Sequence, residues 1–303
     1  MQFIDPRVDF AFKKIFGNEN AKDILIDFLN SILGLEGIYR IKEVVILDPY
    51  QAPKIKYTKK SYVDVRCTDE RNIQYIVEMV VFLPSMAKTT LVHPCTSQVE
   101  YVKGMEKRII YNASKRYANQ IEKGEDYPKL NQVISINILD FNMFEFPHYL
   151  SIHRTKETIT GNCYLDEIKY YFIELNKFSK KIEELTTNLE KWIYFIKEAS
   201  NLNTIPKELE NNVFKHAFEI ARVSNMSKEE WEAYDMESML IQDERGMIEA
   251  ALEKGEKLGV EKGKIEGEKL GIKKTAKNMK DKGLDINLIC ELTGLSIEDI
   301  NKL

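Results

Sequence analysis

Residues 60–79 read KSYVDVRCTDERNIQYIVEM and have the pattern of two short strands joined by a polar turn. Side chains of the two predicted faces alternate before the turn, in YVDVRC at 62–67, and again after it, in QYIVEM at 74–79. Because successive side chains of a strand point to opposite faces, this alternation predicts a β-hairpin. If the hairpin folds about Arg71, Asp64 lies directly opposite Glu78 on the same face.

The predicted pairing of Asp64 with Glu78 leads to the hypothesis of a divalent-metal site. Opposed residues of an antiparallel pair have Cβ atoms about 5 Å apart, so the two carboxylates repel each other unless a positive charge lies between them. Mg²⁺ takes oxygen ligands, and in this position it could activate a water for hydrolysis of a phosphate ester. The competing interpretation is a solvent-facing strand surface, where acidic residues are common.

Several segments of the chain, taken in order, resemble one known family closely over about residues 4–145. They are DPRVDFAFKKIFG at 5–17, YVDVRCTDE at 62–70, YIVEM at 75–79, GMEKRIIYNASKRYANQ at 104–120, KGEDYPKL at 123–130 and VISINILDF at 133–141. Together they resemble the PD-(D/E)XK nuclease-like transposases, also called recombination-promoting nucleases. The resemblance implies an α/β fold of the restriction-endonuclease-like class, which has a mixed sheet flanked by helices.

The family resemblance also implies the metal ligands and a third catalytic residue. The family's core is an Asp on the first strand and an E-x-Q motif on the second, which implies Mg²⁺ held by Asp64 and Glu78. The position two residues after Glu78 carries Val80, however. Removing residues 80–97 joins the remaining segments as YIVEMQVEYVKGMEKR and restores the family pattern. We therefore interpret 80–97 as an insertion and Gln98 as the catalytic Gln.

Residues outside the hairpin are expected to support the site or to contact DNA, some from the resemblance and the lysines from the basic surface of the helix at 104–124. Three match recurring family positions and are expected to support the site: Asp9, Tyr111 and Gln120. Three basic residues are expected to contact the DNA backbone: Arg108, Lys107 and Lys115. The competing interpretation of the basic residues is ordinary helix-surface charge with pairs four residues apart. That interpretation is favoured for Lys13 and Lys14.

The function implied is Mg²⁺-dependent hydrolysis of DNA phosphodiester bonds in recombination or transposition. DNA is then the expected partner. The alternative is a catalytically impaired family member, whose E-x-Q motif is split by the insertion. Such a protein would act only by binding DNA or by self-association.

Hydrophobic periodicity extends this picture along the chain. Apolar segments predict strands at 42–48, 130–141, 148–154 and 165–178, and helices at 21–33 and 104–124. The alternation of strands and helices predicts an α/β layer, and the family resemblance implies that residues 1–178 form a PD-(D/E)XK nuclease-like domain. Residues 179–253 have the helical pattern throughout and predict a helical subdomain. Residues 254–303 predict a glycine-rich helix or linker followed by a short helical module.

Glycines recur every four residues from Gly255 to Gly271, separated mainly by Glu and Lys. Each glycine costs a helix about 1 kcal/mol relative to alanine, so a helix here is marginal by itself. One interpretation is a self-association seam that forms a homo-oligomer. The other is a flexible charged linker.

Composition excludes several classes of protein. The 303 residues carry a formal net charge of −4, so there is no overall basic character of a nucleic-acid coat protein. The four cysteines are far apart and form no CxxC motif, which argues against a zinc site or a disulfide framework. No apolar run approaches the roughly 18 residues of a membrane helix. A cytoplasmic protein is expected.

Overall fold

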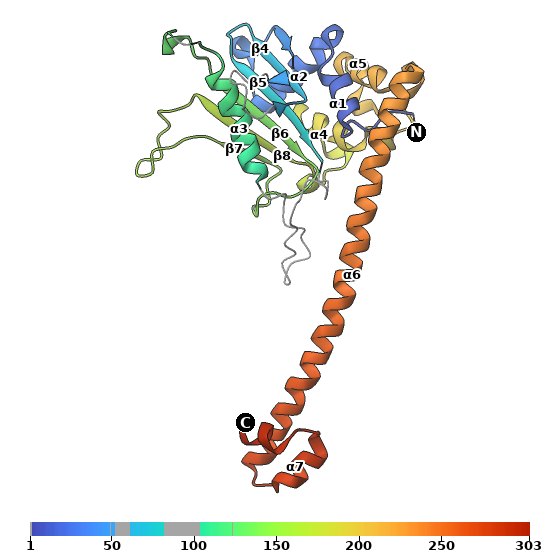
Figure 1. The fold of residues 1–303 in the computed structure, drawn as a ribbon. Coiled ribbons are helices and arrows are strands. Elements are labelled where there is room, and N and C mark those ends of the chain that lie inside the picture. Colours follow the sequence, from blue (N-terminus) through green and yellow to red (C-terminus); the bar gives the residue numbers. More distant parts are fainter. Residues whose placement is uncertain (1, 49, 52–60, 82–103, 123) are drawn as a thin grey trace. The chain divides into compact units, whose positions relative to one another are not determined.

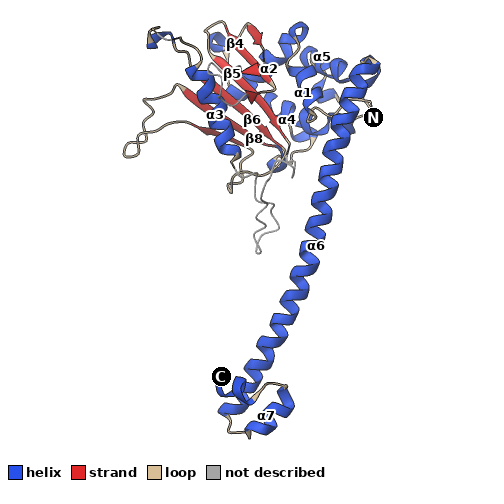
Figure 2. Ribbon diagram, in the orientation of Figure 1, coloured by secondary structure: helices blue, strands red, loops and turns tan. Residues whose placement is uncertain are grey.

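The structure is a computed structural model that describes residues 2–48, 50–51, 61–81, 104–122 and 124–303. These residues fall into two compact units, divided near residue 244. The first unit contains the β-sheets and most of the helices, and the second is helical (Figures 1 and 2).

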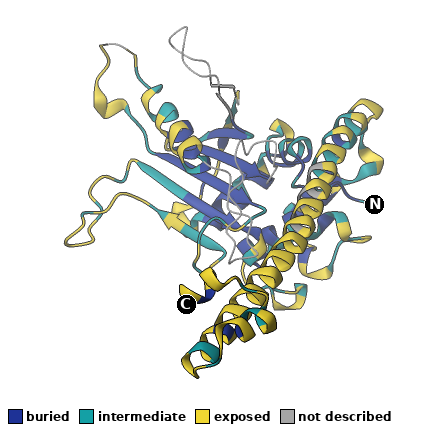
Figure 3. Cartoon of the chain, turned by 60° about the horizontal axis from the view of Figure 1, so that its bottom comes forward, coloured by how far each residue is buried: buried dark blue, intermediate teal, exposed yellow. Residues whose placement is uncertain are grey.

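The central sheet of the first unit has six strands in the order β1-β4-β5-β6-β8-β7. They are β1 (Val44–Leu47), β4 (Val65–Asp69), β5 (Gln74–Val80), β6 (Val133–Leu139), β7 (Leu150–His153) and β8 (Ile168–Glu174). The middle strands β5, β6 and β8 are parallel, whereas β1, β4 and β7 run antiparallel to their neighbours. Every residue of β5 and β6 is buried. Figure 3 shows the strands in the middle of the sheet largely in dark blue, as buried. These two strands therefore form the centre of the fold.

The hairpin predicted from residues 60–79 is confirmed in its register but not in the length of its first strand. Val65 pairs with Val77, which is the register of a hairpin folded about Arg71. The first strand is interrupted, because β3 (Ser61–Tyr62) pairs with β2 (Tyr50–Gln51) in a separate two-stranded sheet. Val63 and Val65 pack in different apolar clusters. The predicted alternation therefore breaks at Asp64, between β3 and β4.

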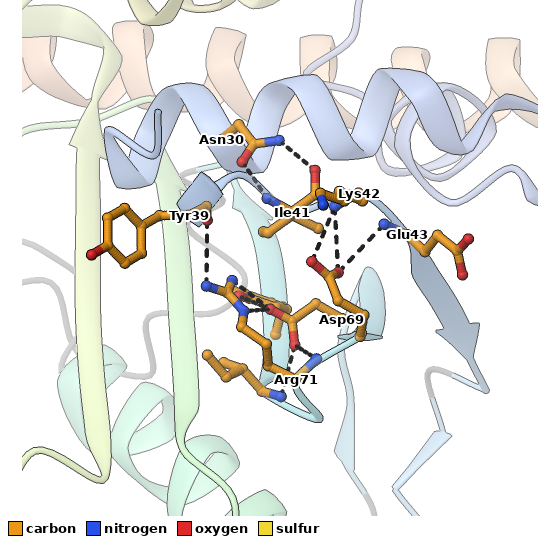
Figure 4. A network of polar contacts seen from close by, with 10 residues as sticks. Asn30, Tyr39, Ile41, Lys42, Glu43, Asp69 and Arg71 are labelled. Atoms are coloured by element: carbon orange, nitrogen blue, oxygen red, sulfur yellow. Dashed lines mark hydrogen bonds and ion pairs between the residues drawn. The ribbon is translucent and has the colours of Figure 1, made fainter. Parts of the chain in front are cut away.

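The turn of the hairpin is held by the buried carboxylate of Asp69 (Figure 4). It accepts hydrogen bonds from two backbone N–H groups of the turn, both at 2.9 Å, and from the hydroxyl of Tyr75 at 3.0 Å. The guanidinium of Arg71 also donates to it, at 2.6 and 2.9 Å. The neighbouring carboxylate of Glu70 accepts longer bonds, of 3.3–3.4 Å, from the backbone N–H groups of residues 42–43. Asp69 thus fixes where the chain reverses.

One large apolar core joins the sheet to four helices. These are α1 (Asp9–Phe16), α2 (Lys22–Leu33), α4 (Asn188–Glu198) and α5 (Asn212–Ala221). Trp192 of α4 contacts Phe16, Phe28 and Phe214, so aromatic rings from all four helices meet in this core. Helices α4 and α5 therefore share their core with α1 and α2, and the two-unit division falls later, near residue 244.

Helix α3 (Met105–Ala118) packs against other sheet residues in two smaller clusters. Its side chains Met105 and Ile109 lie against Val80, and Ala113 lies against Ile76. The apolar stripe predicted for 104–124 is confirmed at these three α3 positions. The helix ends earlier than predicted, at Ala118.

The second unit contains the end of α6 (Lys228–Asp281), with α7 (Ile286–Thr293) and α8 (Ile297–Asn301). Ala276, Ile289 and Ile300 form its small core. The glycine repeat from Gly255 to Gly271 is helical throughout, so the interpretation as a flexible linker is wrong for this structure. None of the helices in the described ranges is long and apolar enough to cross a membrane.

Candidate active site

Asp64 and Glu78 come together beside β5. Continuing the register of β4 and β5 by one residue places Asp64 opposite Glu78. Asp64 lies just before β4, and its Oδ2 accepts a hydrogen bond from the backbone N–H of Met79 at 2.7 Å. Glu78 is only 3% exposed. The backbone of β5 thus fixes the carboxylate of Asp64, which comes from the segment just before β4.

Two side chains of α1 lie next to Asp64. The Nζ of Lys13 is 2.6 Å from Oδ2 of Asp9 and 3.9 Å from Oδ1 of Asp64. Asp9 and Lys13 are one helical turn apart, so both reach the same neighbour. Asp9 also lies beside Asp64, and its role as a supporting residue stays a prediction. Lys13 is partly exposed and forms the ion pair four residues apart that is typical of a helix-surface charge, and its ammonium group also lies near Asp64.

Two side chains of α3 bind Glu78 from the other direction. The amide of Asn112 donates to Oε1 of Glu78 at 2.8 Å, and the guanidinium of Arg108 donates to Oε2 at 3.4 Å. Arg108 was expected at the DNA backbone, and in this structure it pairs with Glu78. The sequence analysis missed Asn112. The only local signal was its position one helical turn after Arg108.

The surroundings raise the pKa of both carboxyl groups. Burial is the first cause of the raised pKa of Asp64, and the nearby charges of Asp9 and Glu78 add to it. Burial also raises the pKa of Glu78, although Arg108 and Asn112 oppose this shift. Because burial and like charge both disfavour ionisation, the pair favours a bound cation or a bound proton.

The chemistry of the pair fits Mg²⁺. Among the residues that the structure describes, no group of three or more His, Cys, Asp or Glu is arranged to hold a metal ion. Mg²⁺ does not need such a group, because it often keeps several waters and binds through one or two carboxylates plus substrate phosphate. Asp64 and Glu78 supply the two carboxylates. When bound, the ion would polarise a phosphate oxygen and activate a water.

Val80 occupies the position of the family's E-x-Q glutamine, two residues after Glu78. It is 3% exposed and packs in an apolar cluster: Met105, Ile109, Leu139 and Phe172. Glu78 and Val80 lie on the same face of β5, so this position is filled by a core side chain. Gln98 and most of the predicted insertion 80–97 lie outside the described residues.

The remaining predicted residues make contacts on α3 and beside β6. Lys107 is exposed on α3, and the Nζ of Lys115 lies 5.8 Å from the ring centre of Tyr111. The amide of Gln120 exchanges two hydrogen bonds with the backbone of Asn131, both 2.8 Å long. Gln120 therefore fixes the connection that leads into β6, which is a structural contact.

The fold and the paired carboxylates define a restriction-endonuclease-like protein of the PD-(D/E)XK type, with a mixed sheet, flanking helices and a helical C-terminal region. The chain belongs to the PD-(D/E)XK nuclease family transposases, whose family model it matches over residues 6–86 and 97–251. The comparisons with curated proteins and with solved structures gave no match.

The family match has a gap that bears on the predicted insertion. Its two segments leave out residues 87–96, which lie inside 80–97. The second segment begins one residue before Gln98. The insertion at 80–97 therefore stays a prediction, because residues 80–86 and residue 97 belong to the matched segments.

We expect Asn112→Ala to destabilise the protein mainly where Glu78 is ionised. The charged carboxylate would lose a buried donor, at a cost of about 1–3 kcal/mol. Denaturant unfolding at about pH 4 and about pH 8 brackets the titration of a glutamate whose pKa is raised. The loss should be larger at the higher pH. Lys107→Ala, on the exposed side of α3, should change little, and an equal loss by Asn112→Ala at both pH values would contradict the pairing.

Proposed function

We propose that this protein is a Mg²⁺-dependent DNA endonuclease that acts in recombination or transposition. The observation that supports this proposal is the carboxyl pair of partly buried Asp64 and buried Glu78, both with raised pKa values. A divalent cation offsets their repulsion and supplies the charge needed beside a phosphodiester. Family membership makes DNA the substrate class to test.

The surrounding side chains have separate tasks in this proposal. The backbone N–H of Met79 and the amide of Asn112 orient the two carboxylates. Lys13 and Arg108 neutralise them when no metal is bound. When a metal takes over that task, both cations become available for DNA phosphates, where charge-assisted bonds are strong.

Other predicted residues extend the proposed DNA contact. Lys107 and Lys115 lie along α3, and they would contact the backbone beside Arg108. Gln98 keeps its proposed role, which is to orient the attacked phosphate. Position 98 is therefore a target for mutation as well as Asp64 and Glu78.

Nicking of supercoiled DNA tests this proposal. The full chain should nick DNA with Mg²⁺ and stop when EDTA removes the ion. Glu78→Gln should lower the rate about 100-fold or more, since losing even a residue behind the metal ligands typically costs 10–100-fold. The exposed residue Glu145 provides a matched control, Glu145→Gln, which should leave the rate unchanged. Equal nicking by Glu78→Gln would refute the assignment of Glu78.

A second candidate is a family member that binds DNA but does not cut it. Val80 favours it, because an apolar core residue stands at the E-x-Q position. A chain lacking residues 80–97 places Gln98 directly after Met79, at the E-x-Q position. The variant Val80→Gln places a glutamine at the same position and keeps the rest of the segment. A buried amide costs about 1–3 kcal/mol, so both proteins are first checked for folding. Nicking by these variants only would show that the added segment silences the site, whereas nicking by the unaltered chain excludes this candidate.

A further inference from the structure

A cavity of about 460 Å³ lies at the edge of the central sheet that β7 and β8 form. Strand β7 is the last of the six strands and pairs with β8 (Figure 1). Three of the residues that line the cavity carry a positive charge, and the full lining is a set of six: Ile152, His153, Arg154, Lys156, Lys169 and Tyr171. We call this cavity the β7 pocket.

The β7 pocket and the side chain of Glu78 lie on opposite faces of the sheet. Tyr171 packs in the large core, and Ile152 is its partner on β7, so the two share a face. Glu78 shares the other face with Ile76 and Val80, which pack against α3. Ile152 is 53% exposed, so the helices leave this part of the sheet uncovered. The pocket is therefore separate from the carboxylate pair.

Asp166 holds two cations of the β7 pocket in place but offsets only one positive charge. Its Oδ2 is 2.7 Å from Nζ of Lys169, and its Oδ1 is 3.8 Å from Nη1 of Arg154. Lys156 is exposed. The carboxylate of Glu157, next in the chain, accepts bonds of 2.6 and 2.9 Å from backbone N–H groups of the turn that follows. Three positive charges against that of Asp166 leave two for a ligand.

Phosphate groups match this arrangement. Cations that share a cavity repel one another, and a bound anion removes the repulsion. A guanidinium donates two N–H groups at once to phosphate oxygens, and an ammonium group binds them as a point charge. The volume lies in the range of about 300–1,000 Å³ that is typical of small-ligand sites, so it exceeds what one phosphate needs. Ile152 and Tyr171 add an apolar wall that suits the sugar of a nucleotide.

We propose that the β7 pocket binds the phosphate groups of a nucleotide or of a DNA backbone through Arg154, Lys156 and Lys169. Both sources offer the same phosphate-ester chemistry, so separate probes are needed to tell them apart. The inference does not depend on nuclease activity, because the binding is measured without a metal ion.

Calorimetric titration of the full chain in EDTA tests the pocket with two probes, ADP and a short DNA duplex. The double variant Arg154→Gln, Lys156→Gln removes two exposed charges. It should weaken binding of the accepted probe by about 10-fold or more, since hydrogen bonds between charged groups are among the stronger ones. The matched control, Lys207→Gln, Lys215→Gln, removes two exposed charges elsewhere in the same unit and should bind like the unaltered chain.

The salt dependence of duplex binding gives a second readout. Each lost phosphate contact lowers the slope of log K against log salt by about 0.9, so the double variant should lower it by about 2. Weaker binding of ADP alone would assign the pocket to a free nucleotide, and weaker binding of the duplex with the smaller slope would assign it to a DNA backbone. The proposal is overturned if the unaltered chain binds neither probe, or if the double variant binds both as tightly as its control.

Discussion

Asp64→Asn should abolish Mg²⁺-dependent nicking and at the same time make the metal-free protein more stable. The amide oxygen can still accept the hydrogen bond from the Met79 N–H, which is 2.7 Å long in the structure. The negative charge that burial, Asp9 and Glu78 all disfavour is removed. We expect at least a 100-fold loss of nicking, since losing a metal ligand should cost at least as much activity as losing a residue that hydrogen-bonds to a ligand.

The gain in stability should depend on pH in a defined direction. The pKa of Asp64 is raised in the folded protein, so the folded state binds more protons than the unfolded state between the two pKa values. The free energy of unfolding therefore falls as pH rises from the unfolded pKa through the folded one. At neutral pH, Asp64→Asn should therefore have the higher free energy of unfolding and the higher Tm. At acidic pH, where Asp64 is protonated, the two proteins should be alike.

Thermal unfolding with and without Mg²⁺ measures both sides of this prediction. Mg²⁺ should stabilise the unaltered chain, because the ion binds only the folded pair, and it should do little for Asp64→Asn. Asp126→Asn, at an exposed position, controls for the loss of a charge elsewhere. A variant that is less stable than the unaltered chain at neutral pH would mean that Asp64 is a structural anchor, and the metal-site assignment would then be wrong.

The sequence alone was enough to place Asp64 opposite Glu78, because hairpin register follows from local alternation and the turn. Alternation could not show that the backbone bends at Asp64, since Val63 and Val65 look alike in the sequence and yet pack in different clusters. Which face each residue takes was decided by the packing of separate helices on the sheet.

Contacts across layers were harder to predict than contacts along a strand. Asn112 reaches Glu78 from α3, and Lys13 reaches Asp64 from α1. Neither pairing has a periodic signal, because each depends on how a helix is oriented over the sheet. The continuous α6 was also missed in part, since the intrinsic cost of its glycines argued against a helix that the structure nevertheless forms.

Asp69→Ala should be the most destabilising change in the hairpin, at about 2–4 kcal/mol. Its side chain is 0% exposed, and removing it leaves the hydroxyl of Tyr75 and two backbone N–H groups without their acceptor. Each buried group left unpaired costs about 1–3 kcal/mol. The lost ion pair with Arg71 adds less to this cost, because the Arg71 side chain is 38% exposed and water can replace the carboxylate. Denaturant unfolding of the folded protein gives the value directly.

The neighbouring residue supplies a matched control for Asp69. Glu70→Ala removes a carboxylate from the same turn, but one whose hydrogen bonds are 3.3–3.4 Å long, and it should cost less than about 0.5 kcal/mol. If Asp69→Ala fails to fold, the milder pair Asp69→Asn and Tyr75→Phe still measures the contact through a double-mutant cycle. Additive effects in that cycle would contradict the proposed role of the Asp69–Tyr75 bond.

The consequence of Asp69 for the site follows from the geometry of strands. Asp64 and Glu78 are equally far from the turn, so their pairing depends on the residue at which the chain reverses. A slip of one residue would turn the whole strand over and move Glu78 away from Arg108 and Asn112. Asp69→Ala should therefore lose nicking together with stability. Asp64→Asn, in contrast, should lose nicking while the free energy of unfolding rises. The opposite changes in stability distinguish Asp69, which holds the hairpin in register, from Asp64, which the site needs for chemistry.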